Sequence, residues 1–196
     1  MKSIEPFQLS SSAQQGFRLI EFDEDEKLLC EVRKHWFGLF LIYLTGTFIA
    51  VVLMGLSLGA ILMDSNTSTE MGFELSALQL PIIFACFLAT ILVLIGTAIG
   101  AYLYKSNVII VTSEKLAQLL NVSLFKRKVS QLSIGDIQDV SVRQNGLLAH
   151  LFKYGTIIIE TSGEQQNYTF TFATHPYETT KTIVNAHEEN LKLYGN

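Results

Sequence analysis

Two long uncharged stretches dominate the hydropathy pattern of the chain. The first covers residues 36–63 and the second covers residues 80–104, and neither contains Asp, Glu, Lys or Arg. A helix crosses the hydrocarbon core of a bilayer with about 20 apolar residues. No soluble fold needs two such runs, so the pattern predicts two transmembrane helices, at residues 36–63 and 78–104.

The charges that flank these stretches predict their orientation. Residues 64–77, which connect them, include acidic residues but no Lys or Arg, whereas Arg33 and Lys34 precede the first stretch and Lys105 follows the second. Lys and Arg concentrate on the cytoplasmic side of membrane helices. We therefore expect a cell-membrane protein with two spans, an extracytoplasmic loop at 64–77, and both termini in the cytoplasm.

Beyond Lys105 the pattern changes to a period of two residues, which is typical of β-strands, and it is strict at 168–173. Predicted strands lie at residues 107–112, 115–122, 128–134, 137–143, 155–161 and 168–173. A helix should begin near Pro176, and its semi-apolar stripe consists of Tyr177, Thr180, Val184, His187, Leu191 and Tyr194. Residues 105–196 therefore form a predicted β-rich domain in which one helix covers an open end of the sheet.

The residues before the first uncharged stretch are polar. Residues 1–20 are rich in Ser and Gln and predict a flexible tail. Residues 21–35 start with an acidic run and end in Arg33-Lys34-His35, so we interpret them as a cytoplasmic juxtamembrane segment.

Composition agrees with a membrane protein and excludes other classes. Apolar residues make up 49% of the chain and charged residues 16%, against about 25% charged residues in ordinary soluble domains. The formal net charge of −4 gives no indication of nucleic-acid binding. The two cysteines, Cys30 and Cys86, do not make a disulfide framework.

Several short segments are similar to those of one known family. They are Glu26–Leu29, Arg33–Trp36 and Asn107–Leu116, and most specifically Ile134–Val140, Gln144–Leu148 and Leu151–Thr156. Through them the chain resembles the bacterial pleckstrin-homology-like (PH-like) membrane proteins, which have two membrane helices followed by a PH-like domain. The resemblance implies a PH-like barrel of two nearly orthogonal sheets with a C-terminal capping helix, and it implies no catalytic role.

The basic run Lys126-Arg127-Lys128 is the first candidate binding site. It lies between two predicted strands, where a hairpin could contact anionic lipid headgroups at about 1 kcal/mol per cation. Arg143 and Lys153 would extend such a patch, as would Lys105. The alternative is a solvated hairpin whose charges only oppose aggregation.

The glycine pairs in the two uncharged stretches and the apolar run at 146–152 each have two interpretations. Both uncharged stretches carry a Gly-x-x-x-Gly, formed by Gly55, Gly59, Gly96 and Gly100. This spacing permits close helix contact, either between copies of the chain or between its own two spans. The apolar run 146–152 is either a short helix at the membrane surface or against a partner, or a loop that closes the barrel and buries its leucines.

No residue pattern indicates catalysis. The four histidines, His35, His150, His175 and His187, lack partners at metal-ligand spacing, and the spans contain no ionisable residue of the kind that transporters use. We expect no enzyme activity, cofactor or metal. The sequence favours a binding module at the cytoplasmic membrane surface that contacts lipid headgroups or a membrane protein; the alternative is a scaffold that oligomerises through its transmembrane helices.

Overall fold

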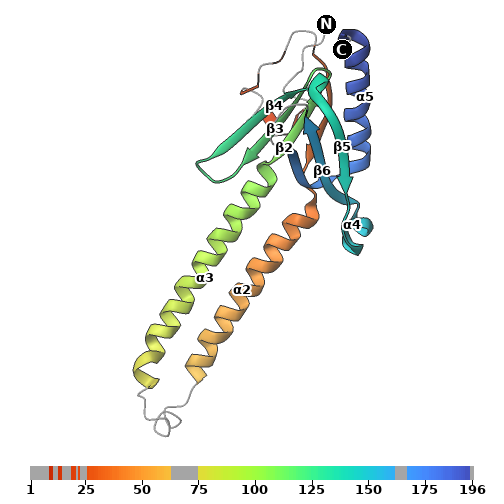
Figure 1. The fold of residues 1–196 in the computed structure, drawn as a ribbon. Helices are drawn as coiled ribbons and strands as arrows, with labels where there is room; N and C mark the ends of the chain where they lie inside the picture. The colour runs from red at the N-terminus through yellow and green to blue at the C-terminus, as the bar shows by residue number, and fades with distance from the viewer. Residues whose placement is uncertain are drawn as a thin grey trace. The chain divides into compact units, whose positions relative to one another are not determined.

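The chain forms two compact units in the computed structural model, which describes residues 9–10, 13–14, 19–20, 22, 26–62, 75–161 and 167–194. The helical unit consists of residues 40–102, and the β-rich unit consists of residues 1–39 and 103–196. Figure 1 shows the elements of each unit. Residues 64–74 of the expected extracytoplasmic loop at 64–77 fall outside the described residues, and residues 75–77 belong to a helix.

The helical unit contains the greater part of two long apolar helices. Helix α2 spans Trp36–Leu62 and α3 spans Leu75–Ser106. Both are long and apolar enough to cross a membrane, with mean hydropathies of 2.3 and 2.8. Most of their large side chains are exposed within the described part of the chain. Helices that are apolar on every side and uncovered by protein fit a lipid environment, which agrees with the predicted spans at 36–63 and 78–104.

The β-rich unit contains two antiparallel sheets. The first has the order β1-β2-β3-β4 and the second has the order β5-β6-β7. The first sheet consists of β1 (Leu28–Arg33), β2 (Val108–Thr112), β3 (Lys115–Asn121) and β4 (Arg127–Ser133). The second consists of β5 (Ile137–Arg143), β6 (Tyr154–Thr161) and β7 (Tyr168–Thr174). Helices α4 (Leu147–Phe152) and α5 (Pro176–Tyr194) and the 3-10 turn η2 (Ile134–Asp136) complete the unit. The strands after residue 105 match those predicted.

Strand β1 corrects the predicted domain boundary. We assigned residues 21–35 to a juxtamembrane segment and began the domain at residue 105, yet Leu28–Arg33 forms the edge of the first sheet. Arg33 pairs with Val108, so α2 and α3 are inserted between two neighbouring antiparallel strands, where a hairpin would have a turn. The strand was missed because six residues beside a long apolar run give little periodicity of their own.

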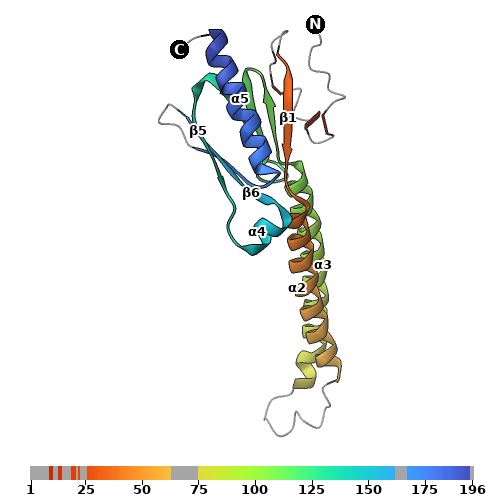
Figure 2. The same cartoon turned by 90° about the vertical axis from the view of Figure 1, so that its right-hand side faces the viewer.

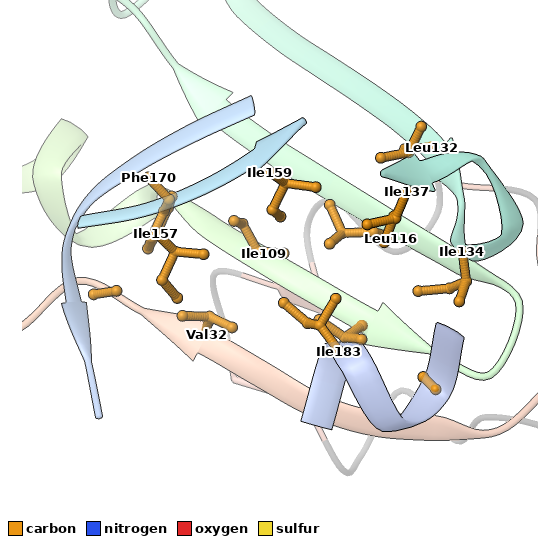
Figure 3. Close-up of a cluster of buried hydrophobic side chains, with 13 residues drawn as sticks. Val32, Ile109, Leu116, Leu132, Ile134, Ile137, Ile157, Ile159, Phe170 and Ile183 are labelled. Carbon is orange, nitrogen blue, oxygen red and sulfur yellow. The ribbon is translucent and has the colours of Figure 1, made fainter. Parts of the chain in front are cut away.

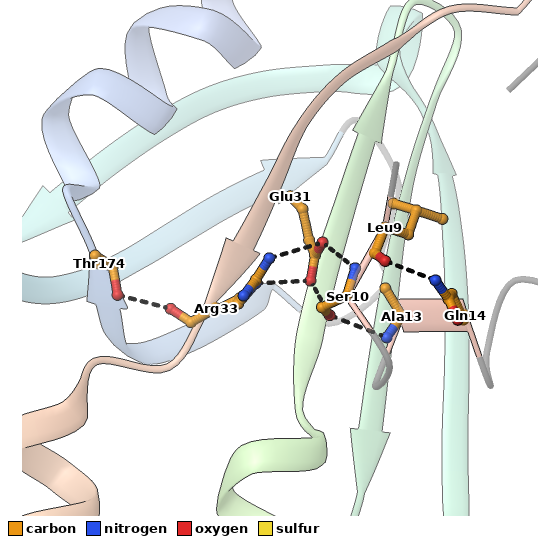
Figure 4. A network of polar contacts seen from close by, with 7 residues as sticks. All are labelled: Leu9, Ser10, Ala13, Gln14, Glu31, Arg33 and Thr174. Carbon is orange, nitrogen blue, oxygen red and sulfur yellow. Dashed lines mark hydrogen bonds and ion pairs between the residues drawn. The ribbon is translucent and has the colours of Figure 1, made fainter. Parts of the chain in front are cut away.

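The N-terminal residues also depart from the prediction. We expected a flexible tail at 1–20, but Leu9, Ala13 and Ile20 are buried against the outer face of the first sheet. Two contacts hold this segment, because the backbone N–H of Ser10 donates to Glu31 Oε2 at 2.9 Å and the Ser10 hydroxyl donates to Glu31 Oε1 (Figure 4). All five residues of β2 are consequently buried, since both faces of the strand are covered.

The core lies between the two sheets and beneath α5. Figure 3 shows Val32 of β1 and Ile109 of β2 facing Ile157 and Phe170 of the second sheet. Ile183 of α5 closes one side of this cluster, and Figure 2 shows α5 lying between β1 and β5. The predicted capping helix is therefore present, in agreement with the expected barrel.

The predicted apolar stripe of this helix matches its buried face only in part, through Thr180 and His187. Its buried residues are Pro176, Ile183 and Ala186, whereas Tyr177 is 60% exposed and Val184 and Leu191 are also exposed. Positions 183 and 186 are one turn apart, so they define a face that is rotated by one residue from the predicted stripe. Ile183 enters the core between the sheets, and the larger apolar residues of the stripe remain outside.

Candidate functional site

The residues at which α2 leaves the β-rich unit and α3 re-enters it lie close together, and we call this part of the unit the junction end. It comprises residues 33–39 and 103–108. The Tyr104 hydroxyl donates to the carbonyl oxygen of His35 at 2.7 Å. The rings of Tyr104 and Phe172 also meet edge to face, with centroids 6.3 Å apart. Gly38 packs so closely on Tyr104 that a Cβ atom there would overlap its ring.

Aromatic side chains fill the junction end. The Phe37 ring stacks on Phe152 at a centroid distance of 4.8 Å and on Tyr154 at 5.2 Å. Tyr154 in turn stacks on Phe172 at 5.0 Å. Stacked aromatic pairs add stability beyond the area that they bury. This cluster therefore fixes the first turn of α2 against β6, β7 and the end of α4.

Phe172 reaches the cluster through an unusual backbone conformation. Its φ is 53°, which is rare for a bulky residue. Its carbonyl oxygen accepts a hydrogen bond of 2.6 Å from the His35 N–H. The strict alternation predicted for 168–173 fails here, because Phe170 and Ala173 both enter the core while Phe172 turns out to the junction. The tertiary contacts hold a conformation that the local sequence disfavours.

Lys34 and His35 connect the two sheets beside this cluster. The Lys34 amine donates to the carbonyl and hydroxyl oxygens of Thr171, at 2.6 and 2.8 Å, and lies 4.6 Å from the Phe170 ring centroid. Burial lowers the pKa of Lys34 to about 8. Burial, and then repulsion from His175, lower the pKa of His35, whose Nδ1 accepts from the Phe37 N–H at 3.1 Å. Lys34 and His35 thus have structural partners and are not available to bind a ligand.

The basic run begins at the last residue of the β3–β4 turn and continues into β4, in a hairpin whose base lies next to the end of α3 (Figure 1). Asn121 fixes this position, because its N–H donates to Asn107 Oδ1 at 2.7 Å and its side chain donates to the Ser106 carbonyl at 3.3 Å. Lys126 and Lys128 are exposed. Arg127 is exposed too, but its Nε donates to Asn121 Oδ1 at 2.8 Å and so helps to shape the hairpin.

An apolar tip precedes the basic run, and sequence reasoning missed it. Val122, Leu124 and Phe125 are all exposed, and Phe125 is 99% exposed. The turn is ordered by its own hydrogen bonds, since the Val122 N–H donates to the Lys126 carbonyl at 2.9 Å. The sequence did contain a signal for this tip, because Leu124 and Phe125 lie between two predicted strands. The hairpin therefore presents apolar side chains and cations together.

Helix α4 presents a second exposed apolar surface. We left open whether this run forms a helix or a loop with buried leucines; it forms a helix, and Leu147 and Leu151 are 83% and 67% exposed. Leu148 is exposed as well, whereas Ala149 is buried. The loop alternative is wrong, because the run is helical and its inward positions are taken by Ala149 and Phe152 while its leucines remain exposed.

Of the other predicted cations, Lys105 lies in the last turn of α3, and Arg143 and Lys153 lie on either side of α4. Arg143 ends β5 and Lys153 follows α4, and both are exposed. Lys153 borders a cavity of about 250 Å³ with His150 and His175. Arg143 and Lys153 belong to the part of the unit that carries α4, whereas Lys126 and Lys128 belong to the hairpin of the first sheet. The structure thus distributes the predicted patch over two elements.

The Gly-x-x-x-Gly residues do not all mediate contact between α2 and α3. A Cβ atom at Gly100 would lie 3.8 Å from Ile42, but the positions of Gly55, Gly59 and Gly96 face open space. The close approach of the helices occurs instead at Gly46, where a Cβ atom would overlap Thr97. Packing between the chain's own spans therefore explains only Gly100 among the four predicted glycines.

Comparison with known proteins identifies the family. No curated protein matches the chain. Among solved structures, a DUF1696 family protein with a pleckstrin-homology domain from Shewanella loihica PV-4 matches with 17% identity and a TM-score of 0.34, over 41% of this chain and 70% of that one. That likeness is too low to carry an argument. The family model for the bacterial PH domain matches residues 37–183, which is most of the sequence. The chain thus belongs to the bacterial PH domain family.

Proposed function

We propose that this protein is a non-catalytic binding module, held in the membrane by α2 and α3, that contacts anionic lipid headgroups through its β3–β4 hairpin. The observation that carries the proposal is the hairpin tip, where the fully exposed Phe125 stands beside Lys126 and Lys128. The apolar tip suits the boundary of the acyl chains, and the cations that follow it suit the phosphates of the headgroups.

The position of the tip supports this assignment. Asn121 is hydrogen-bonded to Ser106 and Asn107, the residues at which the chain leaves α3. If α3 crosses the bilayer up to the tyrosines at its end, these residues lie at the membrane surface, and the hairpin tip lies there with them. Lys105 would then mark the cytoplasmic side, which carries the anionic lipids.

The expected energies are sufficient for a surface contact of a protein that is already anchored. Lys126 and Lys128 would contribute about 2 kcal/mol together, at about 1 kcal/mol each. Phe125 would add about 1.5–3 kcal/mol if it were fully buried among the acyl chains. No translational freedom has to be lost on contact, because α2 and α3 would already hold the domain at the surface.

The test places a fluorescent probe at the hairpin of the full-length protein in lipid nanodiscs. A Val122→Cys variant, in a background with both native cysteines replaced by Ser, carries an environment-sensitive dye. In anionic nanodiscs at low salt we expect blue-shifted emission and quenching by lipid-borne nitroxides. High salt or the change Lys126→Glu with Lys128→Glu should reduce both signals. Arg127 stays unchanged because it bonds to Asn121.

A matched control changes two exposed lysines elsewhere. Lys181→Glu with Lys192→Glu alters the same net charge on α5, where both side chains are exposed. This variant should leave the probe signal unchanged. Water-like emission from the probe in every lipid composition would reject the hairpin contact.

A scaffold that oligomerises through its helices is the second candidate. It is favoured by Gly55, Gly59 and Gly96, which face open space and can accept another helix. Gly55→Ile with Gly59→Ile should then lower the oligomer mass measured by light scattering in detergent. Gly46→Ile is unsuitable as a control because it would overlap Thr97. Met54→Phe with Ile61→Phe adds bulk at exposed positions that helical spacing places on another face of α2, and it should leave the mass unchanged.

A further inference from the structure

Helix α4 exposes a large apolar surface for a helix of six residues. Three of its six residues are exposed leucines, Leu147, Leu148 and Leu151. Soluble surfaces rarely expose clustered large apolar residues without a binding role. Trp36, which is also exposed, continues this surface, since its ring meets Phe152 edge to face at 5.4 Å.

The leucines are held outward by the fold. Ala149 is buried beneath the helix, and Phe152 stacks on Phe37 at 4.8 Å. The helix starts after Gly146, whose φ of 91° suits only glycine, and it ends at Lys153 in the left-handed conformation. Both ends of α4 are therefore fixed, and the apolar face cannot turn into the core without breaking these contacts.

The contacts of α4 also identify what covers it. Phe37 and Trp36 are the first residues of α2, the helix proposed to enter the bilayer. Tryptophan at such a position belongs to the headgroup level of a membrane. Because Phe152 packs on both rings, α4 lies at the depth at which α2 would enter, and its outward leucines meet the same interface.

The surrounding charges agree with a lipid surface. No acidic residue occurs between Asp139 and Glu160, whereas Arg143 and Lys153 flank the helix on either side. Anionic headgroups would attract such a segment, and no carboxylate within it would oppose the contact.

We propose that α4 is an interfacial membrane helix, whose leucines insert into the bilayer surface beside the first turn of α2. This proposal rests on the membrane anchorage proposed above but not on the hairpin contact. Apolar insertion differs from the hairpin contact in one measurable respect, because it requires neither anionic lipid nor low salt.

The test uses two probes in the full-length protein in nanodiscs. Trp36 is the single tryptophan of the chain, so its quenching by brominated lipids reports whether the start of α2 lies in the bilayer. A dye on His150→Cys, in the cysteine-free background, reports the position of α4 while all three leucines remain. We expect lipid quenching of both probes in neutral and in anionic nanodiscs, with little change at high salt.

Removal of the leucines should move the dye at residue 150 away from the lipid and leave Trp36 in place. Leu147→Ser with Leu151→Ser should lower quenching at residue 150 several-fold and leave Trp36 quenching unchanged. Leu191→Ser with Leu193→Ser removes two exposed leucines from α5 and should change neither signal. Circular dichroism of each variant checks that the fold is retained, as expected for exposed positions.

Each contrary outcome overturns a different statement. Quenching of Trp36 without quenching at residue 150 overturns the insertion of α4 and leaves the anchorage intact. Absence of both signals overturns the anchorage as well. Quenching at residue 150 only in anionic nanodiscs at low salt assigns the contact to Arg143 and Lys153 and overturns apolar insertion. A disulfide dimer of the unlabelled His150→Cys variant, formed on addition of an oxidant, overturns insertion and assigns the surface to a second copy of the chain.

Discussion

Truncation of Val32 tests whether the strand before α2 belongs to the folded core. Val32 is 2% exposed, pairs with Ile109, and lies in the cluster between the sheets. Val32→Ala removes two buried methyl groups and leaves a cavity. With about 0.8 kcal/mol per buried carbon and an added cavity term, we expect a loss of about 2 kcal/mol in the free energy of unfolding of the β-rich unit.

Hydrogen exchange of the full-length protein in detergent measures this loss. The most protected amides of β2 exchange only when the unit opens, so a loss of about 2 kcal/mol accelerates them roughly 30-fold. Leu29→Ala in the same strand is the control, since Leu29 is 40% exposed. Its effect should stay within about 0.5 kcal/mol, or roughly twofold in rate.

The result that refutes the reasoning is unchanged exchange at Ile109–Val111 in Val32→Ala. It would mean that Leu28–Arg33 does not contribute to the cooperative unit. The family match begins at residue 37 and does not include these residues, so this experiment supplies independent information about them.

Three further predictions concern the junction end and the domain boundary. Burial lowers the pKa of Lys34 from 10.5 to about 8, so the unfolded state binds its proton more tightly and the free energy of unfolding should rise as the pH increases from about 8 toward 10.5. The difference in melting temperature between the wild type and Lys34→Met checks this at pH 8–9. That window lies below the range from 9.0 to about 11 in which Cys30, whose pKa is raised by burial, lowers stability as the pH rises. Phe172 has a positive φ, which glycine adopts more readily than alanine. The Phe172→Gly variant should therefore be about 1 kcal/mol more stable than Phe172→Ala, whereas glycine is the less stable of the two in ordinary strands. Thermal unfolding of the two variants measures this difference. A fragment of residues 105–196 should fail to fold, because it lacks strand β1. A chain that joins residues 26–34 to 107–194 through an Asn-Gly turn should fold and give dispersed amide NMR signals, because Arg33 pairs with Val108 and a short turn can connect them.

The sequence by itself determined the elements whose signal is local. Charge-free stretches longer than a bilayer predicted α2 and α3, and the alternation of side chains predicted the strands after residue 105. These predictions hold because hydropathy and period-two alternation act within a few residues. The cations of the hairpin were recognised for the same reason, as Lys126-Arg127-Lys128 forms a contiguous run.

The tertiary structure alone decided which segments pair and which side chains are covered. Leu28–Arg33 becomes a strand only through β2, which follows it after two long helices. Leu9 lies in a polar segment and Leu147 in an apolar run, yet Leu9 is buried on the first sheet and Leu147 is 83% exposed. Phe172 departs from the alternation of inward and outward side chains in its strand, because its ring packs in an aromatic cluster formed by distant segments of the chain. Burial depends on what lies opposite a residue in space, and that information is not contained in its neighbours along the chain.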